Sequence, residues 1–219
     1  DRERVTVVPV GVEHDVFVPP TKPRVKGRIV TTASADVPLK GLVPLLEALA
    51  KLRTERDVHL VVVGSLRKGG ATEETLDRLD LNDAVEFVSD VAEPELVEIF
   101  GSAQVAVVPS LYEGFSLPAV ELMSCATPLV ATNAGALPEV VGPDGEAVLR
   151  VEPGDPQELA VALGRLLDDD ELAARIGAAG RARVIENYTW SVVAARTADW
   201  YRQCLAKAAD GTEEDHADR

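Results

Sequence analysis

The sequence lacks the features that mark secreted and membrane-spanning proteins. Cysteine is scarce: Cys125 and Cys204 are the only two, they fall in different predicted helices, and they show no paired spacing. This pattern favours a reducing compartment, by default the cytoplasm, over a disulfide framework. No stretch approaches the roughly 18 consecutive apolar residues of a membrane span, and no basic and then apolar leader opens the chain. We therefore expect neither a spanning helix nor a signal peptide.

The sequence also has few basic residues and no cluster of histidines. The chain carries 22 basic against 37 acidic residues, a formal net charge of −15, which repels DNA, RNA and anionic membrane surfaces. Any phosphate-bearing ligand must therefore be held by local donors. The histidines His14, His59 and His216 lack metal-ligand spacing, and His59 lies in a predicted strand, where a structural role is the simpler interpretation. We expect no metal site and no nucleic-acid partner.

The sequence has enough apolar residues, in the right order, for an α/β domain. Its 219 residues, 46% of them hydrophobic, suffice for one globular domain with a substantial core. Short β-branched runs alternate with helical patterns, which predicts an open parallel sheet with helices on both faces. The predicted strands span residues 28–33, 58–63, 84–88, 104–109, 128–132 and 147–151. The helices predicted to connect them span residues 42–53, 93–102 and 117–125.

The two ends of the chain show other patterns. After the last predicted strand the sequence indicates a C-terminal helical segment without further strands, with helices over residues 155–168, 170–179 and 190–208. The first residues are rich in proline and glycine, which is typical of a linker. The predicted divisions are a linker-like segment with a short strand at residues 5–8 (1–27), the domain itself (28–208) and an acidic, disordered tail (209–219).

Ligands of open parallel sheets bind at the carboxyl ends of the strands, so the loops that follow the strands are the places to search. Three stand out, at residues 34–41, 64–70 and 110–117. The third is the most informative, because Ser116 is a suitable N-cap for the helix that follows and Pro118 suits its first turn. The backbone amides of residues 114–117 then form an anion site, and Gly114 lets a ligand approach the main chain.

Two glutamates flank this predicted anion site. Glu113 precedes it in the loop, and Glu121 lies about one turn into the helix. Carboxylates accept hydrogen bonds well from hydroxyl pairs such as those of ribose or a hexose. Taken alone, two glutamates beside a helix start are more commonly a solvated face or partners of the helix dipole. The residues around them decide between these interpretations.

The surrounding motif resembles that of the retaining glycosyltransferases of family 4, the large group 1 type, whose GT-B fold has two facing Rossmann-like domains. The family signature is a glutamate, seven residues and a second glutamate, which Glu113 and Glu121 match. The resemblance also covers an interdomain linker at Val7 to Phe17 and the start of a final helix at Tyr188 to Trp190. The matching motif comprises Pro109-Ser110, Glu113-Gly114-Phe115-Ser116-Leu117-Pro118, Glu121, Met123, Thr127-Pro128-Leu129-Val130-Ala131-Thr132, Gly135 and Pro138-Glu139-Val140-Val141.

The resemblance implies roles for individual residues. Glu113 is expected to face the transferred sugar near its anomeric carbon, and Glu121 to bind the ribose hydroxyls. Lys40 matches the phosphate-binding lysine of the family, where its ammonium suits a diphosphate leaving group; the alternative is an ordinary surface lysine. The backbone amides expected to bind the sugar and the distal phosphate are those of Gly114, Phe115, Ser116 and Leu117. The residues expected near the nucleobase are Ser89, Asp90 and Val91.

Two positions depart from the family pattern. Ser34 stands where the family usually has an arginine that clamps the pyrophosphate, and serine cannot supply a bidentate cation. Either Arg67 or Lys68 substitutes for it, or the donor is held less strongly, or this subgroup uses another arrangement. Ala126 replaces the usual glycine after the Met123 helix, a small change that we expect to be tolerated.

The resemblance implies that the chain is one half of a GT-B fold, the C-terminal domain that binds a UDP-, GDP- or ADP-linked sugar. Its reaction would be retaining hexosyl transfer that needs neither a metal nor another cofactor. The acceptor-binding N-terminal domain is expected to be missing from this chain, together with any peripheral attachment to a membrane. Two alternatives stay open: a binding module without catalytic activity of its own, and a degenerate homologue, for which Ser34 argues.

Overall fold

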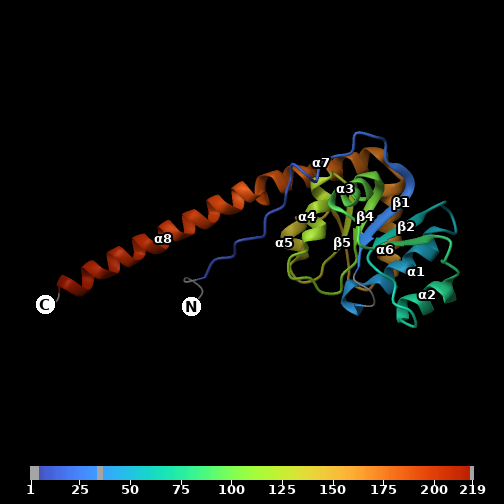
Figure 1. Cartoon of the computed structure of the whole chain (residues 1–219), viewed down its shortest axis with the longest axis horizontal. Helices are drawn as coiled ribbons and strands as arrows, with labels where there is room; N and C mark the ends of the chain where they lie inside the picture. Colours follow the sequence, from blue (N-terminus) through green and yellow to red (C-terminus); the bar gives the residue numbers. More distant parts are fainter. Residues whose placement is uncertain (1–4, 34–36, 218–219) are drawn as a thin grey trace.

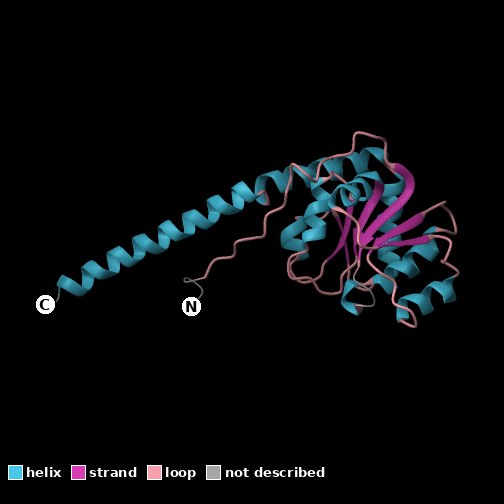
Figure 2. Ribbon diagram, in the orientation of Figure 1, coloured by secondary structure: helices cyan, strands magenta, loops and turns pink. Residues whose placement is uncertain are grey.

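The computed structural model describes residues 5–33 and 37–217, and the side chains of the last helix as far as Lys207. Its centre is a six-stranded parallel sheet in the order β3-β2-β1-β4-β5-β6 (Figure 2). The strands are β1 (Val25–Thr32), β2 (His59–Val63), β3 (Val85–Val88), β4 (Ala103–Val108), β5 (Leu129–Thr132) and β6 (Leu149–Val151). The parallel α/β sheet predicted from the alternating patterns is thus confirmed.

The sheet is covered on both faces, which explains why its strands are almost continuously apolar. Neighbouring residues of one strand belong to different cores: Ile29 packs on one side of β1 and Val30 on the other. The helices are α1 (Leu42–Leu52), α2 (Ala71–Leu79), α3 (Glu93–Ser102), α4 (Leu117–Ser124), α5 (Leu137–Val141), α6 (Pro156–Asp168), α7 (Asp170–Asn187) and α8 (Trp190–Ala217). One core lies under α1, α2 and α6, and the other under α3, α4 and α5 (Figure 1).

Two helices and a single turn were not predicted. Helix α2 buries only Thr72, Thr75 and Leu76, so its sequence carries little apolar periodicity. Helix α5 has five residues, too few for a periodic pattern. The turn is a 3-10 helix at Pro38–Lys40, which ends in Gly41 with a positive φ of 67°. It places Lys40 directly before α1.

The long C-terminal helices correct two predicted ends. Helix α7 does not stop at residue 179 but continues to Asn187, because its buried glycines let it pack closely against the segment after α4. A Cβ on Gly177 would lie 2.2 Å from the carbonyl oxygen of Ala126. Helix α8 continues to Ala217, so residues predicted as part of a disordered tail are helical. A helix satisfies its own backbone hydrogen bonds and needs no neighbour to extend, and α8 projects away from the body (Figure 1).

The short strand predicted at residues 5–8 is also wrong. These residues form no strand, and the side chains of Val5 and Val7 are 72% and 89% exposed. A strand needs a neighbour to accept and donate its hydrogen bonds, and the described residues offer none here. The first pairing of the chain is an isolated bridge between Val12 and Thr189, at the beginning of α8.

Candidate functional site

The candidate site lies where the strand order reverses. Strands β1 and β4 are neighbours in the middle of the sheet, yet the chain leaves β1 toward β2 and leaves β4 toward β5. In open parallel sheets, ligands bind in the crevice at such a switch point, outside the carboxyl ends of the strands. The loop after β1 carries Lys40, and the loop after β4 carries Glu113. Two loops singled out separately in the sequence therefore meet at one place.

Short backbone contacts hold the two loops together. The amide of Leu111 donates a hydrogen bond of 2.7 Å to the carbonyl oxygen of Leu39. Gly41 has a positive φ of 67°, and a Cβ there would lie 1.9 Å from the carbonyl oxygen of Pro109. No other residue fits at position 41 without moving one of the loops. The spacing between Lys40 and Glu113 is thus set by the main chain.

The side chains of Lys40 and Glu113 form an ion pair. The Lys40 Nζ lies 2.9 Å from Glu113 Oε2, and the two side chains are 33% and 14% exposed. The Ser110 hydroxyl donates a second hydrogen bond, of 3.0 Å, to the same oxygen. The carbonyl oxygen of Ser110 in turn accepts a hydrogen bond of 2.5 Å from Thr132 Oγ1 at the end of β5. Both predicted catalytic residues are therefore in one polar cluster, while their roles stay predictions.

A third loop, the one after β5, contacts the main chain of Glu113. The amide of Ala136 donates a hydrogen bond of 2.8 Å to the carbonyl oxygen of Glu113. Gly135 has a φ of 57°, and a Cβ there would lie 2.2 Å from the same oxygen. The glycine in the motif is thus required by close approach of the two main chains. The loop after β5 fixes the main chain of Glu113, and the loop after β1 holds its carboxylate.

The start of α4 has the properties of an anion site. Ser116 caps the helix by accepting a hydrogen bond of 3.4 Å from the Ala119 amide, and its φ of 76° is in the left-handed region. The amides of Gly114, Phe115 and Ser116 donate no hydrogen bond to another described residue. Gly114 faces open space, since a Cβ there would meet nothing within 4 Å. Free amides, a helix N-terminus and an open approach together suit a negatively charged group.

Phe115 and Leu117 complete this loop in different ways. Phe115 is half-buried and makes an edge contact with Tyr188, with ring centroids 5.8 Å apart. Leu117, the first residue of α4, is 39% exposed. The ring of Phe115 thus anchors the loop to the body, while Leu117 stays accessible. For both residues the predicted contact with a ligand runs through the main chain.

Glu121 lies half-buried on α4 without a hydrogen-bond partner for its side chain among the described residues. Burial, and then the negative charge of Glu93 at the start of α3, raise the pKa of its carboxyl to about 7. A carboxyl group with this pKa changes charge near neutral pH. It is also free to accept hydrogen bonds from a ligand. Its predicted role with ribose hydroxyls stays a prediction.

The predicted nucleobase residues lie in the loop between β3 and α3. Ser89 and Asp90 are exposed, and Val91 is half-buried. Asp90 has a φ of 55°, and the Ser89 hydroxyl donates a hydrogen bond of 3.3 Å to its side chain. Strand β3 is at the edge of the sheet, separated from β1 by β2. Glu93, which follows this loop at the start of α3, is close enough to Glu121 to affect its pKa. Among the described residues the loop makes no hydrogen bond or ion pair with Lys40 or Glu113.

Two residues, Ser34 and Ala126, depart from the family pattern, and two basic residues could substitute for the missing arginine. Ser34 lies outside the described residues. Arg67 and Lys68 follow β2, are exposed, and make no hydrogen bond or ion pair with the described part of the chain. They are available to a ligand, but whether they replace an arginine stays a prediction. Ala126 has a φ of 51°, a left-handed conformation that glycine adopts more readily.

Ser110 and Thr132 belong to the polar cluster around Glu113, a role that the sequence did not reveal. Both belong to the motif that matches the family, but neither has an assigned role in it. Each lies at the end of a buried strand, and the two strands are neighbours in the sheet. The pattern that could have predicted them is a small hydroxyl residue at the carboxyl end of each of two neighbouring strands. Their geometry becomes visible only once the strand order is known.

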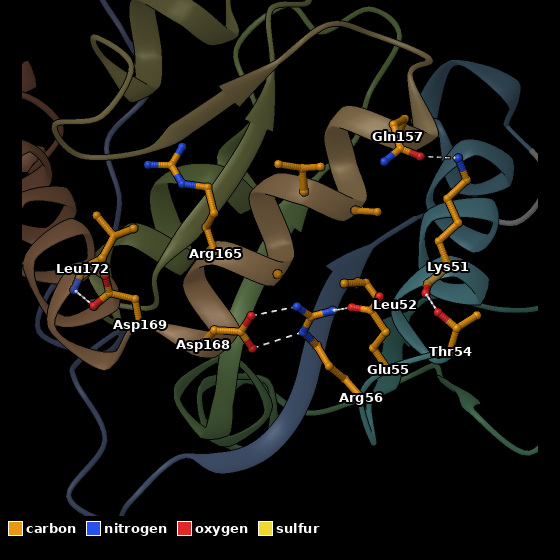
Figure 3. Close-up of a pocket in the computed structure, with 13 residues that line it drawn as sticks. Lys51, Leu52, Thr54, Glu55, Arg56, Gln157, Arg165, Asp168, Asp169 and Leu172 are labelled. Atoms are coloured by element: carbon orange, nitrogen blue, oxygen red, sulfur yellow. Dashed lines mark hydrogen bonds and ion pairs between the residues drawn. The ribbon is translucent and has the colours of Figure 1, made fainter.

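A separate groove lies between the end of α1 and α6 (Figure 3). It has a volume of about 790 Å³ and is lined by side chains of both charges. Arg56 and Asp168 form a bidentate ion pair across it, with N–O distances of 2.7 and 3.1 Å. Neither Lys40 nor Glu113 lines this groove. Charged side chains that neutralise one another leave little to recognise a ligand, so the groove does not compete with the crevice.

The described residues also bear on metal sites and on membrane spans. They contain no group of three or more histidine, cysteine, aspartate or glutamate side chains placed to hold a metal ion. His59, in β2, instead accepts a hydrogen bond of 3.2 Å from Arg28 Nε on the neighbouring strand. Among the same residues, no helix has both the length and the apolar character needed to cross a membrane.

The chain is similar in sequence to known glycosyltransferases. A family model described as "Glycosyl transferases group 1" matches residues 16–183. An "MMP alpha-(1->4)-mannosyltransferase" from Mycolicibacterium hassiacum is 50% identical over 94% of this chain and 50% of its own length. A "D-inositol 3-phosphate glycosyltransferase" from Streptomyces griseus is 36% identical over 90% of this chain and 41% of its own. The chain thus spans about half the length of the curated relatives it matches.

Solved structures show the same similarity at the level of the fold. Sucrose-phosphate synthase from Thermosynechococcus elongatus superposes with a TM-score of 0.80 at 30% identity, covering 92% of this chain and 53% of that one. The C-terminal domain of a glycosyl transferase group 1 family protein from Francisella tularensis gives a TM-score of 0.72 at 26% identity. That match covers 82% of this chain and all of the other. The fold is therefore that of a Rossmann-like domain found in GT-B proteins.

Proposed function

The chain belongs to the group 1 glycosyl transferase family, and we propose that it binds a nucleoside diphosphate sugar in the crevice beside Lys40 and Glu113. The observation that carries this proposal is the position of the ion pair. Lys40 Nζ lies 2.9 Å from Glu113 Oε2 at the switch point of the sheet, next to the free amides that precede α4. A cation, a carboxylate and unpaired amides together complement a diphosphate and a sugar.

Lys40 and the amides of residues 114–117 are the proposed diphosphate partners. The chain as a whole carries a net charge of −15, so its overall field opposes an anionic ligand. Binding must therefore depend on local positive charge, which these groups supply. The same groups stabilise the charge that builds up on the diphosphate as it leaves. We propose that these groups bind the diphosphate without a metal ion or other cofactor.

The two glutamates are the proposed partners of hydroxyl groups. Glu113 already uses Oε2 for Lys40 and Ser110, which leaves Oε1 for a sugar hydroxyl. Glu121 has no side-chain partner among the described residues and is proposed to bind the ribose. Ser89 and Val91 are proposed to contact the nucleobase, because their loop leads into Glu93, whose charge affects the pKa of Glu121. Recognition would thus extend from the sugar at β4 to the base near β3.

The proposed reaction is hexosyl transfer with retention of configuration. The family resemblance supports retention, and the name of the 50% identical relative supports mannose as the hexose. The curated relatives are about twice as long as this chain. We therefore propose that the acceptor is bound by a region that this chain does not span, and that the chain binds the donor without transferring its sugar.

Calorimetric titration of the chain tests the binding proposal. The ligands are GDP, UDP and ADP, followed by GDP-mannose, UDP-glucose and ADP-glucose. The expected result is binding of one nucleoside series, with heat saturating at one ligand per chain. A degenerate homologue should bind none of them, and that result would overturn the proposal. Release of free or transferred hexose by this chain alone would contradict the division between donor binding and transfer.

A further inference from the structure

Ser110 is fixed more firmly than any other polar side chain that touches Glu113. It follows β4, is 2% exposed, and donates a hydrogen bond of 3.0 Å to Glu113 Oε2. Its carbonyl oxygen accepts the hydroxyl of Thr132, which is itself fully buried at the end of β5. Two neighbouring strands therefore determine where the Ser110 hydroxyl lies.

The carboxylate of Glu113 is held from one side only. Lys40 Nζ at 2.9 Å and Ser110 Oγ at 3.0 Å both contact Oε2. Oε1 makes no hydrogen bond within the described part of the chain. Two donors on one oxygen fix the rotation of a carboxylate and leave the other oxygen with its full capacity to accept. Oε2 therefore accepts two hydrogen bonds, whereas Oε1 accepts none from the described residues.

We propose that Ser110 is a positioning residue whose hydroxyl, fixed by Thr132, orients the Glu113 carboxylate so that Oε1 accepts a hydroxyl of the donor sugar. This inference rests on the proposed function. Lys40 cannot do this alone, because its side chain is 33% exposed on a flexible stem and is itself proposed to meet the diphosphate. When its ammonium turns toward the phosphate, Ser110 keeps Oε2 in place.

The test separates sugar recognition from diphosphate recognition. Affinities of the chain for GDP and GDP-mannose, and for UDP and UDP-glucose as a second pair, are measured by calorimetry before and after Ser110→Ala. The expected result is an unchanged affinity for the diphosphate and an affinity for its sugar conjugate that falls about tenfold, the size of effect typical for one hydrogen bond to a charged group. An unchanged ratio of the two affinities overturns the inference.

A matched control distinguishes positioning from general loss of a buried hydroxyl. Ser124 is also fully buried and donates one hydrogen bond, of 2.7 Å, to the carbonyl oxygen of Phe17. It is at the far end of α4 from Glu113. Ser124→Ala is therefore expected to leave both affinities unchanged. An equal loss of sugar affinity in both variants would show a structural role for Ser110 and overturn the proposal.

A double-mutant cycle shows whether Ser110 acts through Glu113. In a Glu113→Ala background, Ser110→Ala is expected to have no further effect on the ratio of sugar-conjugate to diphosphate affinity. Additive losses overturn the inference. Should Ser110→Ala not fold, Ser110→Cys keeps a weak donor in similar space, and a smaller loss of the same kind is expected. A wild-type chain that binds neither ligand refutes the proposed function instead, so the two failures are distinguishable.

Discussion

Lys40 and Glu113 are 73 residues apart in the chain, and their side chains lie 2.9 Å apart in the structure. The contact exists because β1 and β4 are neighbours at the point where the strand order reverses. Gly41 and the Leu111 amide then bring the two loops into van der Waals and hydrogen-bond contact. A partly buried ion pair must offset the desolvation of both charges and is weak evidence for stability, so this pair is better explained by what it can bind than by what it stabilises.

Lys40→Met is expected to weaken binding of the nucleoside diphosphate by roughly 10- to 100-fold, because it removes a charge-assisted contact but keeps the apolar stem. Lys51→Met is the control, since Lys51 is an exposed lysine that donates a hydrogen bond to Gln157 and lies in the α1/α6 groove. The control should bind as the wild type does. Equal affinities of all three proteins in calorimetry would remove Lys40 from the site.

Glu121 should make the stability of the chain depend on pH. Its carboxyl has a pKa of about 7 in the folded chain against 4.5 for the ordinary group. Between these values the folded state binds more protons than the unfolded state, so the free energy of unfolding decreases as pH rises from about 4.5 to 7 and levels off above. Urea unfolding of Glu121→Gln should lack this decrease. Glu93→Gln should reduce it, and a slope identical to wild type in Glu121→Gln would contradict the account.

The same carboxyl predicts proton release on binding. Ribose hydroxyls that donate to the charged form of Glu121 lower its pKa, so binding near pH 7 should release about half a proton. Calorimetry in buffers with different ionisation enthalpies measures this number directly. Glu121→Gln should release none and bind more weakly. Proton uptake by the wild type would mean that Glu121 is neutral in the complex and does not accept the ribose hydroxyls.

Arg24 is expected to be the most important single polar residue for stability. Its guanidinium donates to the carbonyl oxygens of Gly101, Ala103, Cys125 and Ala126 and to the Thr127 hydroxyl, at 2.7 to 3.2 Å. Burial lowers its pKa, which shows the desolvation that these contacts must offset. Arg24→Ala leaves several partly buried acceptors without a donor and should cost about 3 kcal/mol in urea unfolding.

Arg53→Ala is the control for this prediction. Arg53 also forms two hydrogen bonds, to Asp83 at 2.9 and 3.1 Å, but the carboxylate is largely exposed. Its loss should change the free energy of unfolding far less than the loss of Arg24 does. Similar losses in both variants would show that the network around Arg24 adds nothing beyond a surface ion pair.

Ala126→Gly should stabilise the chain. Ala126 follows the C-cap of α4 with a φ of 51°, and Thr127 donates back to Leu122 as in a helix-ending turn that favours glycine. Relief of the left-handed strain is expected to raise the free energy of unfolding by about 1 kcal/mol. Ala178→Gly, at an exposed position inside α7, should have the opposite sign. A lower thermal midpoint for Ala126→Gly would contradict the strain.

The sequence predicted the parts of the fold that depend on local pattern. Buried parallel strands such as β2 are continuous apolar runs, and Glu113 and Ser116 could be assigned to the loop before α4 because the helix start has its own residues. Tertiary relationships were not predictable in this way. The contact of Ser110 with Glu113 and the effect of Glu93 on Glu121 depend on side-chain directions that no spacing encodes. The length of α8 was missed for the opposite reason, because a polar helix has no apolar period to mark its end.

The most direct test of the central claim is to map the bound ligand onto the backbone by amide chemical shifts. The chain is titrated with the nucleoside diphosphate sugar that it binds in calorimetry. The largest shifts are expected at the amides of Gly114, Phe115 and Ser116, which have no partner among the described residues. Shifts concentrated instead at Lys51, Gln157 and Val161, in the α1/α6 groove, would contradict that claim.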